Sequence, residues 1–300
     1  MKYKKQPLSF DDQAQLLINR GLLVPDKDDL ICALRKVNYY RLSAYWFPFR
    51  YVDPGTGEER FYPNTSLDLV WKRYLFDRRL RLLVLDALEI VEVSILRTLM
   101  VEQFTLQYGP FGYTDPSSFR PELNHARMMD EISKDVDHSK EEFVRCYRRK
   151  YTGETYLPLW MTAELMSFGQ LFTFYRFMHV EEKKKIAKLF GIFTPVFESW
   201  LHTLHYVRNA CAHHARLWNR EIPIRPKIPD VRHQPDWHSP VTVDNTRVYA
   251  ILSILKYLLG HIAPEIEWKA MLLELLSDYV SIPIGHMGFP ENWFESNLWK

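Results

Sequence analysis

The sequence predicts an all-α protein, and three observations support this fold class. Apolar residues recur at steps of three and four between Leu67 and Leu99, which is the period of an amphipathic helix. Glycine is scarce, with 11 in 300 residues, and there is little sign of alternating strands. Thr194 and Pro195 form a strong helix start, because they place a capping residue before a proline at the first helical position.

The expected helices differ mainly in their charge. In chain order they cover residues 12–20, 26–34, 65–107, 122–151 (charged), 161–179 (aromatic) and 194 onward, with two more between 244 and 280. The aromatic segment at 37–50 could stack bases, but such a segment more often belongs to the hydrophobic core. A turn is expected at 53–58, and residues 181–188 are expected to be charged and exposed to solvent. We expect an N-terminal helical region at 1–60, packed on a helical domain at 61–300 that carries a charged insertion at about 112–155.

The composition excludes several function classes. A net charge of +2 does not by itself indicate nucleic-acid binding, and the three cysteines are too far apart for a disulfide framework. Neither a signal peptide nor an uninterrupted apolar span is recognisable, so a soluble cytoplasmic protein without membrane contact is expected. The glycine patterns of Rossmann, P-loop and α/β-hydrolase proteins are missing, which also disfavours a nucleotide-binding module.

One segment, residues 204–219, concentrates polar groups in what should be the last turns of a long helix. His205, Asn209 and His213 follow each other at steps of four and therefore share one face, and the long side chain of Arg208 can reach toward it. Histidine transfers protons near neutral pH, and arginine holds a phosphate bidentately. These are the groups needed for metal-independent RNA cleavage by the 2′-hydroxyl, with a complete site formed where two copies meet.

Other interpretations use the same residues. Zinc binding by His202, His205, His213 and His214 lacks acidic or cysteine co-ligands at helical spacing, and capping or core packing is the default for any single histidine. Non-catalytic RNA binding is the main rival, because the same groups bind phosphate without cutting it. The candidate RNA-binding residues lie mostly in a second basic and aromatic segment, and they are Arg145, Arg148, Arg149, Lys150 and, near the histidines, Arg216.

Two acids of the long helix, Glu89 and Glu92, are further candidates. A buried acid at this position would orient a catalytic group, whereas an ordinary helix would use it in an exposed ion pair. The periodicity alone leaves both interpretations open.

The segment from Arg208 to Asn219, RNACAHHARLWN, resembles the R-x4-6-H motif of the higher-eukaryote-and-prokaryote nucleotide-binding (HEPN) ribonucleases, and in particular their abortive-infection (Abi-like) branch. Four other segments also resemble this branch, so that the similarity spans nearly the whole chain. They are NYYRLSAYWFPFR (38–50), FDRRLRLLVLDALEIVEVSILR (76–97), LPLWMTAELMSFGQL (157–171) and MGFPENW (287–293).

The resemblance implies a HEPN-like helical bundle with an N-terminal extension and inserted helices, forming a homodimer with a composite site. It implies that Arg208 and His213 are catalytic with Asn209 assisting, and His205 and His214 remain supporting candidates. The implied activity is endoribonucleolytic, requires no cofactor or metal, and leaves a cyclic phosphate. The implied biology is phage defence by a toxin-like protein that an antitoxin protein or a small regulatory RNA holds inactive.

Overall fold

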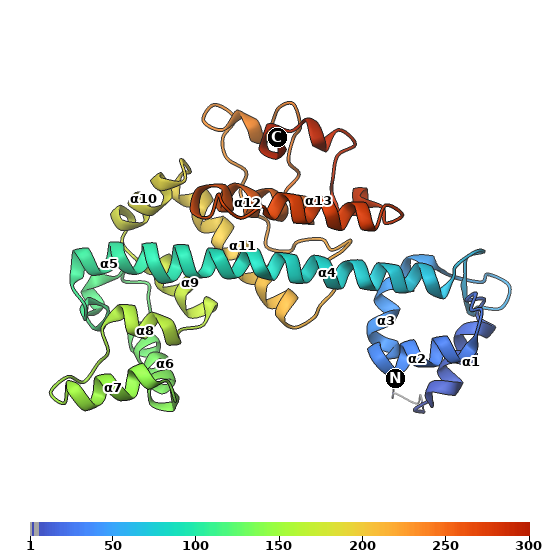
Figure 1. The fold of residues 1–300 in the computed structure, drawn as a ribbon, viewed down its shortest axis with the longest axis horizontal. Coiled ribbons are helices and arrows are strands. Elements are labelled where there is room, and N and C mark those ends of the chain that lie inside the picture. Colours follow the sequence, from blue (N-terminus) through green and yellow to red (C-terminus); the bar gives the residue numbers. More distant parts are fainter. Residues whose placement is uncertain (1, 3–5) are drawn as a thin grey trace. The chain divides into compact units, whose positions relative to one another are not determined.

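The computed structural model describes residue 2 and residues 6–300 (Figure 1). Its described residues form an all-α fold, to which one two-stranded antiparallel hairpin is added. The contacts divide the chain into a first unit, which contains the residues up to Leu80 and Leu275–Ile282, and a second unit, Arg81–Glu274 with Pro283–Lys300. The expected domain limits at residues 60 and 61 stay a prediction.

The first unit has a core formed by amphipathic helices near the N-terminus. Its elements are α1 (Phe10–Asn19), α2 (Lys27–Val37), α3 (Tyr39–Trp46), η1 (Phe47–Phe49), β1 (Arg50–Val52), β2 (Glu59–Phe61), the beginning of α4 (Leu67–Val91) and the end of α13 (Trp268–Asp278). Ser9 and Asp26 cap α1 and α2 by accepting hydrogen bonds from backbone N–H groups. Within the aromatic segment, Tyr45 and Trp46 are fully buried, and the Tyr45 hydroxyl donates to buried Asp77 at 2.6 Å.

The hairpin was not expected from the sequence. Arg50 pairs with Phe61 and Val52 with Glu59, and the predicted turn at 53–58 connects the two strands. Asp53 stabilises this turn, because its carboxylate accepts hydrogen bonds from the N–H groups of Gly55 and Thr56. Strands of three residues are too short to show the alternation of apolar and polar residues by which a strand is recognised in a sequence.

The long helix expected at 65–107 is present, but its winding changes along its length. It consists of α4 (Leu67–Val91), a π-helical segment η2 (Glu92–Leu99) and α5 (Met100–Tyr108). At the end of the π segment the N–H of Met100, the first residue of α5, bonds to the carbonyl of Ile95, five residues earlier. The π segment packs against two short helices of the second unit, α8 (Leu159–Leu165) and α9 (Phe168–Phe177).

Two helices expected to be continuous are each broken into two. The expected helix 122–151 is α6 (His125–His138) and α7 (Glu142–Lys150), because the backbone becomes extended at Ser139 and Glu141. The expected helix 161–179 is α8 and α9, since Ser167 and Gln170 form a capping box that starts a new helix. The run 181–188, expected to be solvated, belongs to helix α10 (Val180–Leu189) and buries Glu182 and Lys183.

The central helix of the second unit is α11 (Thr194–Ala212), which packs against α9, α10 and α12 (Val248–Ile262). Trp200 of α11 is fully buried, and its indole N–H donates to the carbonyl of Lys227 at 2.8 Å. This bond fixes the proline-rich connector that follows α11. The remaining short helices of the chain are η3 (Gly112–Thr114), η4 (Pro116–Ser118), η5 (Pro235–Trp237), η6 (Ile284–Met287), η7 (Trp293–Glu295) and η8 (Asn297–Trp299).

In the part of the chain that the structure describes, no helix combines the length and the apolar character that crossing a bilayer requires.

Candidate functional site

The histidine-rich segment lies at the carboxyl end of α11, and the helix ends earlier than the sequence predicts. Helix α11 stops at Ala212, His213 is the C-cap, and His214 adopts a left-handed backbone with φ of 58°. The His214 N–H bonds to the Cys211 carbonyl at 2.9 Å, and the Ala215 N–H bonds to the Ala210 carbonyl at 2.8 Å. This pair of bonds is a Schellman motif, which usually has glycine at the left-handed position.

Three of the predicted site residues are in contact on α11. The Asn209 side-chain amide donates to Nε2 of His205 at 3.0 Å, and its oxygen accepts from the Arg208 guanidinium at 3.4 Å. An amide that donates to Nε2 leaves the proton of the neutral imidazole on Nδ1. Asn209 therefore fixes both the tautomer of His205 and the direction of the Arg208 side chain.

The His205 ring lies in an aromatic environment that α9 provides. It stacks on Phe168 with ring centroids 5.7 Å apart, and on Phe172 at 6.0 Å. Gly169 leaves room for the ring, since a Cβ atom there would lie 3.1 Å from Nε2 of His205. Burial, together with the positive charges of His202 and Arg208, lowers the pKa of His205, so the ring stays neutral at pH 7.

His213, the residue predicted to transfer protons, is exposed to solvent at the C-cap. It follows Asn209 by four residues, but within the described chain no hydrogen bond joins it to Arg208. One chain therefore presents an oriented arginine and an exposed imidazole that are not bonded to each other. His214 is exposed beside His213, and its left-handed backbone sets the direction in which the chain leaves the helix.

The residues that follow the motif also pack against α11. Arg220 donates to the Tyr206 hydroxyl at 2.8 Å and to the carbonyl of Arg216 at 2.9 Å. These bonds tie the chain after the motif to the face of α11 that carries Tyr206. Arg220 and Phe168 were not among the predicted site residues, although Phe168 belongs to the aromatic helix expected at 161–179 and to the LPLWMTAELMSFGQL segment.

The two acidic candidates have different surroundings. Glu89 is exposed on α4, whereas Glu92 forms an ion pair of 2.6 Å with Arg97, and both of these side chains are only 14% exposed. Arg97 also donates to the carbonyls of Met166, at 2.8 Å, and of Ala163, which lie at the end of α8. Glu92 therefore orients Arg97, and through it the junction between α8 and α9.

The second basic cluster lies on α7, and its side chains are exposed. Arg148 pairs with Asp137 at 2.6 Å, and Arg145 pairs with Glu142 at 3.6 Å. Arg149 donates to the Cys146 sulfur, and the Lys150 ammonium lies over the Tyr151 ring. Exposed ion pairs of this kind are weak, so these cations could exchange their acidic partners for a phosphate. RNA binding by these residues stays a prediction.

The described histidine, cysteine, aspartate and glutamate side chains form no group of three or more that could hold a metal ion. The arrangement at the end of α11 has instead the groups for phosphate binding and proton transfer.

The fold and the site define an all-α protein with an Arg-x4-His motif at the carboxyl end of a buried helix. A model of the family described as Abi-like protein matches residues 32–219, which is more than half of the chain and includes the whole motif. The chain belongs to the Abi-like protein family. This membership suggests a role in abortive infection, a form of phage defence. Searches of curated proteins and of solved structures found no match.

Proposed function

We propose that this protein is a metal-independent endoribonuclease of HEPN type that acts in phage defence. The observation that carries the proposal is the chain of contacts from Arg208 through Asn209 to His205, beside exposed His213. The membership in the Abi-like family supports the biological setting. Such an enzyme needs no cofactor, because the substrate supplies the nucleophile.

The proposed reaction is an internal transfer within the RNA. A base removes the proton of a 2′-hydroxyl, the 2′-oxygen forms a bond to phosphorus, and the bond from phosphorus to the 5′-oxygen breaks. An acid then protonates the 5′-oxygen, which leaves a 2′,3′-cyclic phosphate and a 5′-hydroxyl. His213 is the proposed proton-transfer residue, and Arg208 the residue that stabilises the charge growing on the phosphate oxygens.

The proposed enzyme is a homodimer, because the motif supplies one Arg208 and one His213 per chain, whereas the reaction needs a base, an acid and stabilisation of the charge on the phosphate. A two-fold axis beside the end of α11 would bring a second Arg208 and a second His213 to the same phosphate. Ala212 is exposed at this end of the helix, and its small side chain would permit close approach of another helix.

The experiment compares RNA cleavage by the wild type and by His213→Ala in the presence of EDTA, with products tested for a cyclic phosphate. His138→Ala is the matched control, because His138 is also exposed at the end of a helix. We expect the control to cut like the wild type, and His213→Ala to lose at least about 100-fold in rate. Equal cleavage by all three proteins, or cleavage that needs a divalent metal, would overturn the proposal.

A second candidate function is RNA binding without cleavage, which the exposed cations of α7 favour. It predicts an RNA affinity that falls with added salt, survives His213→Ala, and weakens in Arg148→Gln/Arg149→Gln. For both candidate functions, the proposed inhibitor is an antitoxin protein or a small regulatory RNA. Sequencing of the RNA that copurifies with the protein tests whether a small regulatory RNA is bound.

A further inference from the structure

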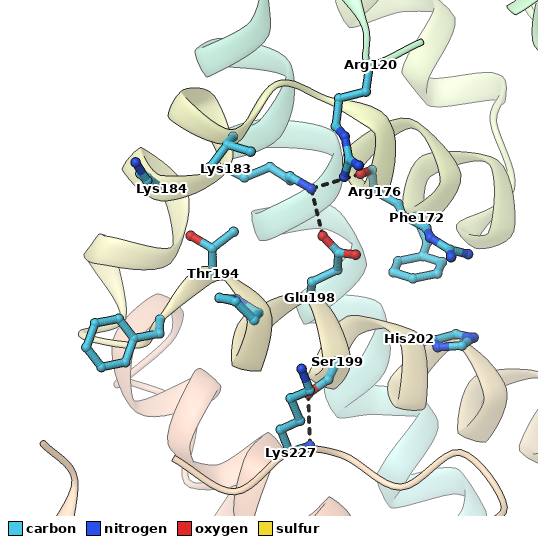
Figure 2. A pocket seen from close by; sticks show the side chains of 13 residues that line it. Arg120, Phe172, Arg176, Lys183, Lys184, Thr194, Glu198, Ser199, His202 and Lys227 are labelled. Atoms are coloured by element: carbon cyan, nitrogen blue, oxygen red, sulfur yellow. Dashed lines mark hydrogen bonds and ion pairs between the residues drawn. The ribbon is translucent and has the colours of Figure 1, made fainter. Parts of the chain in front are cut away.

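A basic pocket opens beside the amino end of α11, in the second unit (Figure 2). Its volume is about 750 Å³, which is within the range of small-molecule sites. We call it the basic pocket, and its charged lining residues are Arg120, Arg176, Lys183, Lys184, Lys227 and Glu198. Five cations face one carboxylate, so the pocket attracts anions.

The cations of the basic pocket differ in how they are paired. Lys183 has a side chain only 3% exposed, pairs with Glu198 at 2.7 Å and also donates to the carbonyl of Arg176, as Figure 2 shows. Arg120 and Lys184 pair with the neighbouring acids Glu122 and Glu181, which lie outside the lining. Arg176 and Lys227 are exposed, and no described carboxylate lies within ion-pair distance of either. These two cations are therefore available to an anionic ligand.

The amino end of α11 adds to the positive potential. Thr194 and Pro195 line the basic pocket, and no side chain caps this end of the helix or places an acid in its first turn. Pro195 has no N–H, and the Val196 N–H bonds to the Phe193 carbonyl at 2.9 Å. The helix dipole is therefore the main feature of this helix end that favours an anion. Phe193 precedes the helix, lines the same pocket and is 55% exposed. Its ring meets the His233 ring edge to face at 4.8 Å, and the surface that stays exposed can stack on a planar group.

A polar stripe connects the basic pocket to the Arg-x4-His motif. Glu198, His202, His205 and Asn209 follow one another along α11 at steps of four, three and four, and therefore share a face. Phe172 lies beside this stripe, since its ring stacks on His202 at 5.2 Å and on His205 at 6.0 Å. From Glu198 to Arg208 the helix rises about 15 Å. A strand that follows this face would lead from the pocket to the motif.

We propose that the basic pocket binds one nucleotide of a single-stranded RNA, and that a phosphate further along the same strand lies at Arg208 and His213. The position of the second phosphate at Arg208 and His213 rests on the proposed function, whereas the binding of a nucleotide in the basic pocket does not. Arg176, Lys227 and the amino end of α11 hold the phosphate, and Phe193 stacks on the base. Glu198, fixed by Lys183, accepts a hydrogen bond from a ribose hydroxyl or a base N–H.

The test measures the affinity of a fluorescent single-stranded oligoribonucleotide in EDTA at several salt concentrations. Arg176→Gln/Lys227→Gln removes two cations of the pocket. Lys185→Gln/Arg225→Gln is the matched control, because it removes the same charge from exposed residues of α10 and of the connector that lie outside the pocket. We expect the pocket variant to bind at least about 10-fold more weakly than the control, with a salt slope smaller by about 1.4.

A second pair of variants tests stacking. Phe193→Ala should weaken binding by about 5- to 150-fold, while Leu189→Ala, which removes another exposed apolar side chain, should leave it unchanged. A nucleoside monophosphate should compete for the wild-type pocket. Equal affinity of pocket and control variants would overturn the inference, and so would binding of the mononucleotide without binding of RNA.

The outcomes separate this inference from the proposed ribonuclease activity. Pocket-dependent binding without any cleavage would overturn the activity and keep the RNA-binding pocket. Cleavage that depends on His213 but is unchanged in the pocket variant, in rate and in substrate affinity, would keep the activity and overturn the pocket.

Discussion

The mostly buried ion pair between Arg97 and Glu92 allows a prediction whose magnitude follows from the structure. Arg97→Ala leaves Glu92 without its partner and removes two hydrogen bonds to carbonyls at the end of α8. Breaking a fully buried pair costs about 3–5 kcal/mol. Since both side chains are 14% exposed, we expect a loss of about 2–4 kcal/mol in the free energy of unfolding. For a unit of this size, that lowers Tm by about 4–16 °C.

Two further variants identify the origin of this loss. Glu92→Gln keeps the carbonyl bonds of Arg97 and should cost about 1–2 kcal/mol, which is less than Arg97→Ala. Arg127→Ala removes an exposed partner of Glu131, whose loss should cost at most about 1 kcal/mol. Urea unfolding followed by tryptophan fluorescence measures all three. If Arg97→Ala costs no more than Arg127→Ala, the role assigned to the pair is refuted.

Three further predictions concern the carboxyl end of α11. Burial and neighbouring positive charge lower the pKa of His205 below 6.5, so around this pH the unfolded chain takes up a proton that the folded chain does not. The free energy of unfolding should therefore fall as the pH drops below about 6.5, and urea midpoints should show a smaller fall in His205→Gln. His214→Gly should be more stable than His214→Ala by about 1 kcal/mol, because both lack the imidazole and only glycine is unstrained at a φ of 58°; equal unfolding midpoints would contradict this. Gly169→Ala would place a Cβ atom 3.1 Å from Nε2 of His205, so the ring would have to move and RNA cleavage should slow on the order of 10-fold. The unfolding midpoint should change little, because the higher helix propensity of alanine, about 1 kcal/mol, offsets the cost of the close contact.

Much of the helical organisation could be predicted from the sequence, because amphipathic periodicity and caps are local. The first two helices, expected at 12–20 and 26–34, and the extent of the long helix are examples. The break between α8 and α9 was missed, although the capping box of Ser167 and Gln170 is a readable pattern. Apolar residues on both sides of Ser167 concealed it.

The end of α11 shows a different limit of sequence interpretation. A helix end of this kind usually carries glycine at its left-handed residue, and here His214 takes that position. Without glycine, residues 213–219 looked like a continuation of the helix. The contact between His205 and Asn209 was predictable, since residues four apart on a helix are neighbours.

The basic pocket could not be predicted from local patterns. Arg120, Arg176 and Lys227 belong to segments separated by about fifty residues each. The Arg120 N–H bonds to the Phe177 carbonyl at the end of α9, and both α9 and the connector pack against α11, which brings the three cations to one cavity. The basic cluster on α7 was visible because its cations are adjacent in sequence. Cations that are adjacent in sequence thus revealed the basic surface of α7, whereas the basic pocket became visible only in the structure.

The π segment gives the long helix a place where the number of its residues can change. It buries Ile95 and Leu96, and the flanking helices bury Val91 and Met100. A turn closed by bonds to the fifth residue back holds about one residue more than an α turn. Deleting one exposed residue from Glu92–Leu99 would therefore let the segment rewind as regular α-helix, while the side chains before and after it keep nearly their present directions. The same deletion within α4 would turn all side chains beyond it by about 100° relative to those before it. The loss of a residue therefore disturbs packing less in the π segment than in the α-helix before it.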